Sequence, residues 1–268
     1  MASLRLVIIS LVAALTLVLA PNAAAIVDGK PDFEHDYVVF VGQQVVIPGG
    51  PTINTSACSG VLVAPQVVVT AAHCSFLPPG FPAVPPSWVR YAVRTGQAAR
   101  FTPEAEAFGT IAVHPGFCFG GTCAGGPGGG FTNNDLAVVL IDRPLPGPYA
   151  NLPKEGFAGK HFDKTKQLVA VGYGFVDPLI AGSFGTRNSV QAEAVVASDA
   201  PNFLELPIPS KAKYGTACRV DSGGAALVGN TLVGIHSVGD TSCGGPSYAY
   251  RLDTPDARSF LSQYVDLR

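Results

Sequence analysis

From residue 26 onward, hydrophobic residues fall in short runs, and turn-forming residues separate one run from the next. The runs are rich in valine and isoleucine, while glycine, proline, asparagine and aspartate fill the gaps. Runs of this kind are typical of β-strands, and about a dozen of them predict a barrel or a sandwich. The strands predicted most clearly are Tyr37–Val41, Gln44–Ile47, Gly60–Val63, Val67–Thr70, Trp88–Arg94, Gly109–Val113, Leu136–Asp142, Gln167–Tyr173, Val190–Ala197, Ala225–Val228 and Leu232–Ser237.

One segment near the C-terminus has a helical pattern instead. Within Thr254–Val265, the side chains of Phe260, Leu261 and Val265 fall on one face of a helix. The pair Thr254-Pro255 suits the first turn, because threonine caps a helix and proline is tolerated at its first position. We expect one C-terminal α-helix here.

Two segments are predicted to be surface loops. Leu77–Pro86 contains five prolines, and Phe117–Phe131 is rich in glycine and contains Cys118 and Cys123. A functional role is expected for either loop only if it borders a cleft. A boundary near Pro144–Pro153 divides the chain after residue 25 into two β-rich halves of similar length.

The composition narrows the class of protein. Of 268 residues, 47% are hydrophobic and 13% are charged, with 31 glycines and 23 prolines. These values fit a β-rich globular protein with many turns, and they argue against a disordered chain or a helical bundle. The net charge of −2 gives no electrostatic basis for binding nucleic acid or an anionic membrane. No phosphate-binding loop or zinc-type cysteine and histidine spacing is present, so no metal or other cofactor is expected.

The first 25 residues have the organisation of a secretory signal peptide. Arg5 supplies a positive charge, Leu6–Ala20 forms the apolar region, and Ala23–Ala25 offers a cleavage site of small residues. The alternative is an uncleaved membrane anchor, which is disfavoured because the apolar stretch is short and Pro21 follows it. We expect a secreted protein without a membrane segment after signal removal, in a compartment where the six cysteines pair.

Three motifs carry residue types suited to nucleophilic catalysis. They are Val69–Cys74 with His73, preceded by Cys58–Gly60; Asn134–Val139 with Asp135; and Cys218–Gly224 with Ser222. A serine hydroxyl is a poor nucleophile until a base takes its proton, and the base is best oriented by a carboxylate. With these motifs in the order His, Asp, Ser, the chain resembles the chymotrypsin/trypsin family of serine proteases from Ile26 to the C-terminal helix.

The resemblance implies both a fold and an activity. The fold is all-β, with two six-stranded antiparallel β-barrels, about residues 26–148 and 149–268, and a C-terminal α-helix. The activity is hydrolysis of peptide bonds in protein or peptide substrates, with Ser222 as nucleophile, His73 as base and Asp135 as the group that orients His73. It further implies a monomer that needs no cofactor.

The resemblance also implies the disulfide pairs and the mature N-terminus. Six cysteines allow 15 pairings, and the family pattern selects Cys58–Cys74, Cys118–Cys123 and Cys218–Cys243. Ile26 resembles an activated N-terminus, whose amino group forms a buried ion pair with the aspartate before the nucleophile, here Asp221. Because Ala23–Ala25 directly precedes Ile26, we expect the signal peptidase to create this N-terminus.

Val220 departs from the family pattern, which has glycine at this position. The backbone N–H groups of Val220 and Ser222 are expected to form an oxyanion hole. A β-branched residue resists the positive φ that glycine accepts, and a flipped peptide would remove one donor. This departure keeps a second hypothesis open, a weak or inactive protease-like protein that serves in binding or adhesion.

The family pattern also locates the substrate pocket. Thr216 is expected at the pocket base, where trypsin-like members carry aspartate, so a preference for lysine or arginine is not expected. The other residues expected around the pocket are Ala217 and Arg219 at the entrance, Ser237, Val238 and Gly239 on the edge strand that pairs with the substrate, and Ser247 with Tyr248 on the opposite wall.

His236 precedes this edge strand, where the glutamate-specific branch of the family also has histidine. A small or neutral side chain before the scissile bond is therefore the first expectation, and an acidic one is the alternative. The alternative interpretation of His236 is a histidine that is bonded within the core and has no role in specificity. Separately, Asn54-Thr55-Ser56 fits a glycosylation acceptor, a short pattern that is frequent by chance.

Overall fold

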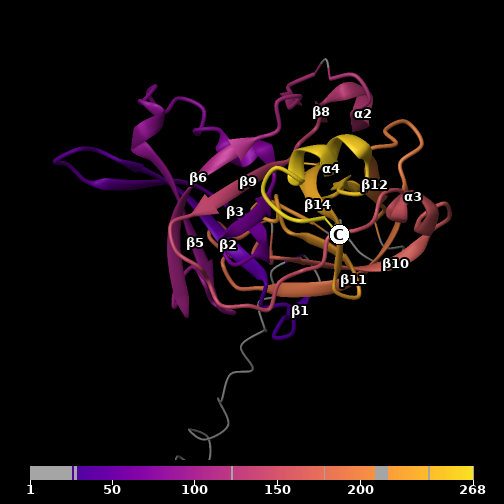
Figure 1. Ribbon diagram of the computed structural model, residues 1–268, viewed down its shortest axis with the longest axis horizontal. Coiled ribbons are helices and arrows are strands. Elements are labelled where there is room, and N and C mark those ends of the chain that lie inside the picture. The colour runs from indigo at the N-terminus through magenta and orange to yellow at the C-terminus, as the bar shows by residue number, and fades with distance from the viewer. Residues whose placement is uncertain are drawn as a thin grey trace, which may run out of the picture.

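The computed structural model describes residues 26, 29–121, 123–177, 179–208, 217–240 and 242–267. The predicted signal peptide and Thr216 lie outside these described residues. The described chain forms two β-barrels that lie side by side, the first drawn in indigo to magenta and the second mainly in orange and yellow (Figure 1).

The first barrel is closed by six antiparallel strands in the order β2-β3-β4-β9-β6-β5. Its strands either alternate apolar with polar residues or are continuous runs of valine, leucine and alanine. Their inward side chains are buried in one core. The hairpin between the first two strands projects from the barrel (Figure 1). The strand bounds are β2 (Val38–Val46), β3 (Thr52–Ala64), β4 (Val67–Thr70), β5 (Val89–Thr95), β6 (Ala105–Val113) and β9 (Ala137–Ile141).

The second barrel has the strand order β11-β10-β13-β14-β15-β12, and pairing of β11 with β12 closes it. A short strand near the N-terminus, β1 (Lys30–Pro31), is added to the edge of β11. The two closed six-stranded barrels confirm the predicted fold class. The strand bounds are β10 (Lys166–Gly172), β11 (Asn188–Val196), β12 (Phe203–Leu206), β13 (Ala225–Val228), β14 (Thr231–Gly239) and β15 (Ser247–Arg251).

The C-terminal helix α4 (Pro255–Leu261) begins one residue after the predicted Thr254, which is its N-cap, and ends four residues before Val265. The Thr254 hydroxyl accepts a hydrogen bond from the backbone N–H of Ala257, which caps the first turn as expected. Phe260 and Leu261 are buried in the core. The remaining short elements are η1 (Ala72–Ser75), η2 (Pro86–Trp88), β7 (Cys118–Phe119), α2 (Pro127–Gly130), β8 (Thr132–Asn133) and α3 (Phe157–His161).

Two predicted strands are one strand in the structure. Tyr37–Val41 and Gln44–Ile47 merge into β2, because the polar residue between them is buried and fully used. The Gln43 side-chain amide donates to the Ser75 carbonyl, and its oxygen accepts from the Thr55 hydroxyl. A buried polar side chain with such partners does not interrupt a strand.

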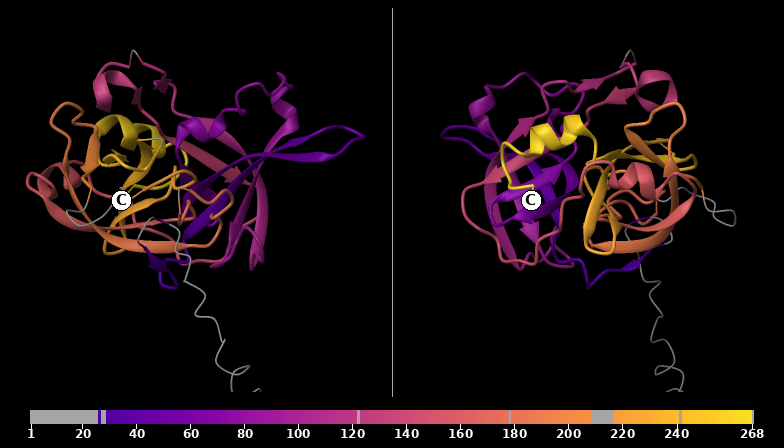
Figure 2. Two further views of the ribbon diagram at one scale, coloured as in Figure 1. Left: turned by 180° about the vertical axis from the view of Figure 1, so that it is seen from behind. Right: turned by 45° about the vertical axis from the view of Figure 1, so that its right-hand side comes forward.

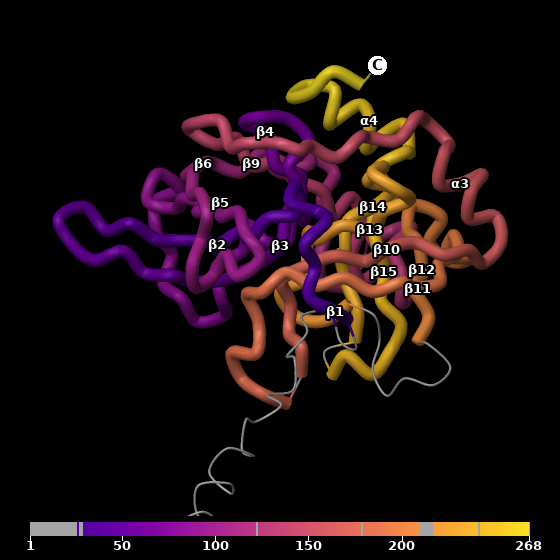
Figure 3. Tube along the Cα trace, turned by 90° about the horizontal axis from the view of Figure 1, so that it is seen from below, coloured from indigo at the N-terminus to yellow at the C-terminus, as the bar shows by residue number. Residues whose placement is uncertain are grey.

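The two barrels dock through hydrogen bonds as well as apolar contacts. The Tyr173 hydroxyl of the second barrel lies 2.6 Å from the Gly96 carbonyl and 3.2 Å from the Val38 carbonyl of the first. The backbone N–H of Ser59 on β3 donates to the carbonyl of Ser222 in the second barrel at 2.9 Å. Figures 2 and 3 show the barrels in contact from the back, the side and below. In the described part of the chain, no helix combines the length and apolarity that a bilayer span requires.

Candidate active site

His73 lies on η1, the turn that directly follows β4. The disulfide Cys58–Cys74 ties this turn to β3. The His73 ring nitrogen Nδ1 lies 2.7 Å from Asp135 Oδ2, and the backbone N–H of His73 donates to Asp135 Oδ1 at 2.9 Å. Two hydrogen bonds to one carboxylate fix both the position and the rotation of the imidazole.

Asp135 lies just before β9 and is completely buried. Besides His73, the Ser237 hydroxyl donates to its Oδ2 at 2.5 Å. Burial alone would raise the pKa of Asp135, but the charge and hydrogen bonds of His73 and the bond from Ser237 lower it below its usual value. Burial likewise opposes charging of His73, yet the adjacent carboxylate raises the pKa of its imidazole. The Asp135 carboxylate therefore favours the protonated imidazole, which is the form that results when His73 accepts a proton.

Ser222 lies in the loop that precedes β13. The next residue, Gly223, has a φ of +78°, and a Cβ there would lie 2.2 Å from Thr70 Oγ1 and 2.4 Å from the Ser59 carbonyl oxygen. Only glycine fits this position, so the sharp turn that presents Ser222 depends on it. The disulfide Cys218–Cys243 holds the start of the same loop.

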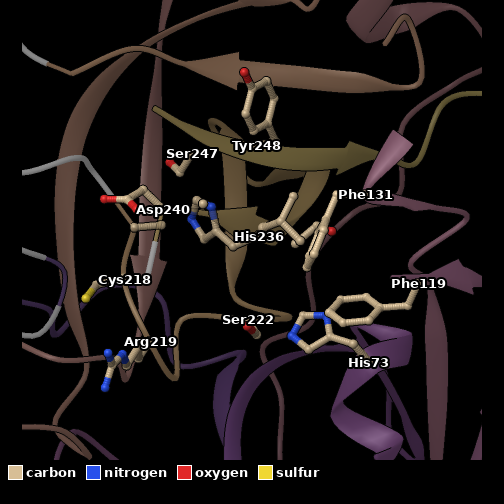
Figure 4. Close-up of a pocket in the computed structure, with 14 residues that line it drawn as sticks. His73, Phe119, Phe131, Cys218, Arg219, Ser222, His236, Asp240, Ser247 and Tyr248 are labelled. Carbon is tan, nitrogen blue, oxygen red and sulfur yellow. The ribbon is translucent and has the colours of Figure 1, made fainter. Parts of the chain in front are cut away.

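His73 and Ser222 line the same cavity of about 240 Å³ between the barrels (Figure 4). Within the described residues, no hydrogen bond joins the His73 ring to the Ser222 hydroxyl. Such bonds are often long before substrate binds. The predicted pocket residues described in the structure all line this cavity, and they are Ala217, Arg219, His236, Ser237, Val238, Gly239, Ser247 and Tyr248.

Sequence reasoning missed two aromatic residues of this cavity, Phe119 and Phe131. They belong to the glycine-rich loop, which the disulfide Cys118–Cys123 closes. The Phe119 ring centroid lies 5.8 Å from that of His73 and 4.8 Å from that of Phe131. The loop therefore borders a cleft, which is the condition under which a functional role was expected. Its aromatic residues beside the paired cysteines were the available signal.

Three polar atoms in the pocket wall are buried without a hydrogen-bond partner. They are both ring nitrogens of His236 and the hydroxyl oxygen of Ser247. Burial lowers the pKa of His236 to about 4, and the nearby backbone of Ala225 offsets this only in part, so the ring is neutral at neutral pH. Buried polar groups normally find a partner, so this wall is suited to a polar ligand.

Val220 has a φ of +72°, in the left-handed region. The sequence predicted that a β-branched residue would resist this conformation, and the structure shows it adopted. A non-glycine residue held there costs about 1–3 kcal/mol, and persists only where its surroundings impose it. The backbone at residue 220 is therefore held in the conformation that glycine would have allowed freely.

Asp221 is completely buried, and its carboxylate accepts from the N–H groups of Cys218 and Gly174 at 3.0 and 2.8 Å. A Cβ at Gly174 would lie 2.2 Å from Asp221 Oδ2, so glycine makes room for the carboxylate. Burial raises the pKa of Asp221 to about 7, against the lowering effect of the two N–H groups. In the described part of the chain, no cation contacts it. Ile26 is also buried, and it belongs to the same hydrophobic cluster as Phe162.

A metal site is not supported by the donor atoms nearest His73. Ligand atoms of Cys58, His73 and Cys74 lie close together. However, both sulfurs are used in one disulfide, and the ring is bonded to Asp135. Disulfide sulfurs lack the thiolate charge that binds metals. The structure contains all three disulfides that the resemblance implied.

Comparison with known proteins agrees with this geometry. The chain is 24% identical over 233 residues to a vitellin-degrading protease of Bombyx mori, covering 80% of each protein. A solved structure described as "Structure of GrC" is similar in fold, with a TM-score of 0.59 and 20% identity, covering 89% of this chain and 97% of that one. The trypsin family model matches residues 26–257. The chain therefore belongs to the chymotrypsin/trypsin family of serine proteases.

Proposed function

We propose that this protein is a secreted serine endopeptidase that cuts protein or peptide substrates through an acyl-enzyme intermediate. The observation that carries the proposal is the orientation of His73. Its Nδ1 is engaged by the buried Asp135, and its ring faces the cavity that Ser222 lines. With Nδ1 bonded, the proton-accepting nitrogen is Nε2.

The reaction follows from these positions. Ser222 Oγ attacks the substrate carbonyl carbon while His73 Nε2 takes the hydroxyl proton. The N–H groups of Val220 and Ser222 stabilise the oxyanion that forms. His73 then donates the proton to the leaving amine, and a water molecule activated by His73 hydrolyses the acyl-enzyme.

The positive charge on His73 during the reaction is stabilised by Asp135. Its carboxylate is buried, bonded by Ser237 and already favoured in the ionised form. No solvent has to reorganise around it when the imidazole becomes charged. The buried, ionised carboxylate of Asp135 distinguishes this histidine from an ordinary surface histidine with an acidic neighbour.

For the residue before the scissile bond, we propose an acidic side chain, the alternative that the sequence left open, in place of the small or neutral one expected first. His236 and Ser247 offer unpartnered hydrogen-bonding atoms, and Arg219 lines the same cavity. The carboxylate of Asp240 also lines this cavity, and it accepts a hydrogen bond from the N–H of Gly244 within its own turn. A carboxylate arriving from substrate would find donors in the wall and a cation nearby.

The N-terminus would complete the site. Cleavage before Ile26 frees an amino group, and the buried carboxylate of Asp221 lacks a cation within the described residues. An ion pair between them would ionise Asp221 and hold the loop of Ser222. N-terminal sequencing of the secreted protein is expected to give Ile26 as the first residue, and another start would contradict this step.

The decisive test is labelling of the secreted protein with a fluorophosphonate probe. We expect the wild-type chain to be labelled and to hydrolyse peptides, and the Ser222→Ala variant to do neither. A folded wild-type protein that is not labelled would favour the alternative, a binding or adhesion protein on a protease fold. Binding of a macromolecular partner unaffected by Ser222→Ala would support that alternative.

The pocket preference has a separate test. Peptides that differ only in the residue before the scissile bond, Glu, Gln, Ala or Lys, are compared by kcat/KM. We expect Glu to be preferred, and His236→Ala to reduce the Glu-to-Ala ratio about tenfold or more. His161→Ala, on the distant helix α3, is the matched control. Preference for Ala would restore the small, neutral specificity, and strong cleavage after Lys would contradict both.

A further inference from the structure

We propose that the hydroxyl of Ser59 is a positioning residue for the oxyanion hole, an inference that rests on the proposed protease activity. Ser59 belongs to the first barrel, on β3, whereas the hole belongs to the second. The starting observation is the unfavourable backbone of Val220, at a φ of +72°. Something outside its own loop has to hold it.

The Ser59 side chain makes the contact that does so. Its Oγ donates to the Val220 carbonyl at 2.9 Å and accepts from the backbone N–H of Tyr173 at 2.9 Å. Because the backbone N–H of Tyr173 donates a hydrogen bond to Ser59 Oγ, the single hydroxyl proton of Ser59 is directed to the Val220 carbonyl. The direction of this hydrogen bond is therefore set by the second barrel.

Ser59 is itself held in place. It is completely buried, its N–H donates to the Ser222 carbonyl, and its own carbonyl accepts from the Thr70 hydroxyl at 2.8 Å. A Cβ added at Gly224 would lie only 3.2 Å from the Ser59 Cβ, so the side chain is tightly enclosed. Its hydroxyl is a fixed donor, not one of several accessible rotamers.

The peptide groups on both sides of Val220 are thereby fixed. On one side, the Arg219 carbonyl accepts from the Phe175 N–H at 3.0 Å. That peptide bond is trans, so the Val220 N–H points the opposite way, away from Phe175. On the other side, Ser59 holds the Val220 carbonyl. With both planes held, the Val220 N–H is oriented before substrate arrives, which is the requirement for an oxyanion donor.

A double-mutant cycle tests this role through kcat. In the Val220 protein, we expect Ser59→Ala to lower kcat about tenfold to 100-fold, because a misdirected oxyanion donor costs up to about 10²–10³. KM is expected to change less than about twofold, since the donor acts on the transition state. In the Val220→Gly protein, Ser59→Ala is expected to lower kcat less than about threefold, because glycine adopts a positive φ without support.

The controls separate positioning from general damage. Ser56→Ala removes a hydroxyl from the same strand that bonds Gln43, and it should leave kcat unchanged. Affinity for a peptide boronate, which requires the hole, should fall in Ser59→Ala in parallel with kcat. If Ser59→Ala does not fold in the Val220 protein, the comparison uses Val220→Gly with and without Ser59→Ala, where a tenfold loss would contradict the inference.

The outcomes distinguish the two levels of the proposal. A wild-type protein that is neither labelled nor active contradicts the protease function and this role with it. An active wild type in which Ser59→Ala lowers kcat equally in both backgrounds, or acts only on KM, contradicts the positioning role alone. A loss confined to the Val220 background supports it.

Discussion

Asp135 and Asp221 are both fully buried, yet the pKa values of their carboxyl groups are shifted in opposite directions. Asp135 accepts from the imidazole and backbone of His73 and from Ser237, and the pKa of its carboxyl is lowered. Asp221 accepts from two backbone N–H groups, and the pKa of its carboxyl rises to about 7. The pKa values differ despite equal burial because His73 lies beside Asp135, whereas no cation contacts Asp221 among the described residues.

The comparison suggests different duties for the two carboxyl groups. The hydrogen-bond partners of Asp135 come from the folded barrels, so its site is complete once the chain has folded. Asp221 has hydrogen-bond donors but no cationic partner in the described part of the chain. Under the proposed function, the amino group freed by cleavage before Ile26 becomes that cationic partner. Under the proposed function, Asp135 therefore acts in catalysis, whereas Asp221 acts in activation of the protein by cleavage before Ile26.

The largest effect is expected from Asp135→Asn. The amide cannot stabilise a charged His73 and favours the wrong tautomer, so kcat should fall by up to about 10⁴. Peptide hydrolysis and the circular dichroism spectrum measure activity and fold together. The exposed Asp163→Asn is the control with the same chemical change, and a loss below about tenfold in Asp135→Asn would remove this residue from the mechanism.

The next effect concerns stability and separates the two aspartates by pH. In a chain extended before Ile26 by Ala23–Ala25, folded Asp221 keeps a proton to about pH 7, whereas an unfolded aspartate loses it near pH 4. Stability should therefore fall as pH rises from about 4 through 7, by a few kcal/mol.

Urea unfolding at pH 5 and pH 8 measures this fall in stability. Asp221→Asn should abolish it, because the amide does not ionise. The chain that begins at Ile26 should not show it, since its amino group pairs with the ionised carboxylate. Equal pH dependence in the extended and cleaved chains would contradict the pairing of Asp221 with the N-terminus.

A smaller effect is expected in the pH profile of the mature enzyme. His73 must be neutral to accept the Ser222 proton, and the Asp135 carboxylate raises the pKa of the imidazole. The rate should rise with pH through a midpoint above about 6.5, the ordinary value for histidine. The profile of kcat/KM measures it, and Asp135→Asn should move the midpoint to lower pH. A midpoint below 6 in the wild type would mean that the carboxylate does not act on His73.

The smallest effect is expected from Ser237→Ala, which takes one partner from Asp135 and leaves His73 in place. Loss of that hydrogen bond makes the carboxylate a weaker support for the imidazolium, and kcat should fall roughly threefold to tenfold. Ser262→Ala, at an exposed hydroxyl on the C-terminal helix, is the control and should not change kcat. An unchanged rate in Ser237→Ala would show that His73 alone determines the state of Asp135.

Strand prediction succeeded where apolar runs are short and sharply bounded. β4 and β13 have the predicted bounds, because each is a continuous apolar run between turn residues. β12 and β15 were missed because their apolar alternation is brief. β15 also ends on Arg251, a buried cation that is satisfied by Asp253 and therefore tolerated in a strand. Pairing of this kind is invisible to a local hydrophobic pattern.

In the candidate site, too, local motifs could be recognised from the sequence, whereas contacts between distant residues could not. The motifs located His73, Asp135 and Ser222, because each is embedded in a distinctive run of neighbours. The contact between Ser59 and Val220 could not be found, since the two residues are 161 positions apart and a lone serine carries no pattern. Val220 itself was identified as unusual, but only the structure shows what compensates for it.

The hydrogen bond from the Ser59 amide to the Ser222 carbonyl makes the two barrels mutually dependent. Under the proposed function, separation of the barrels would remove the Ser59 bond from the Ser222 loop and part Ser222 from His73, and catalysis would stop. An active endopeptidase would then be able to cut the exposed chain of a copy whose barrels have separated. Under that proposal, the lifetime of the protein in solution would be set by how often the barrels come apart, which is a rate and not an equilibrium.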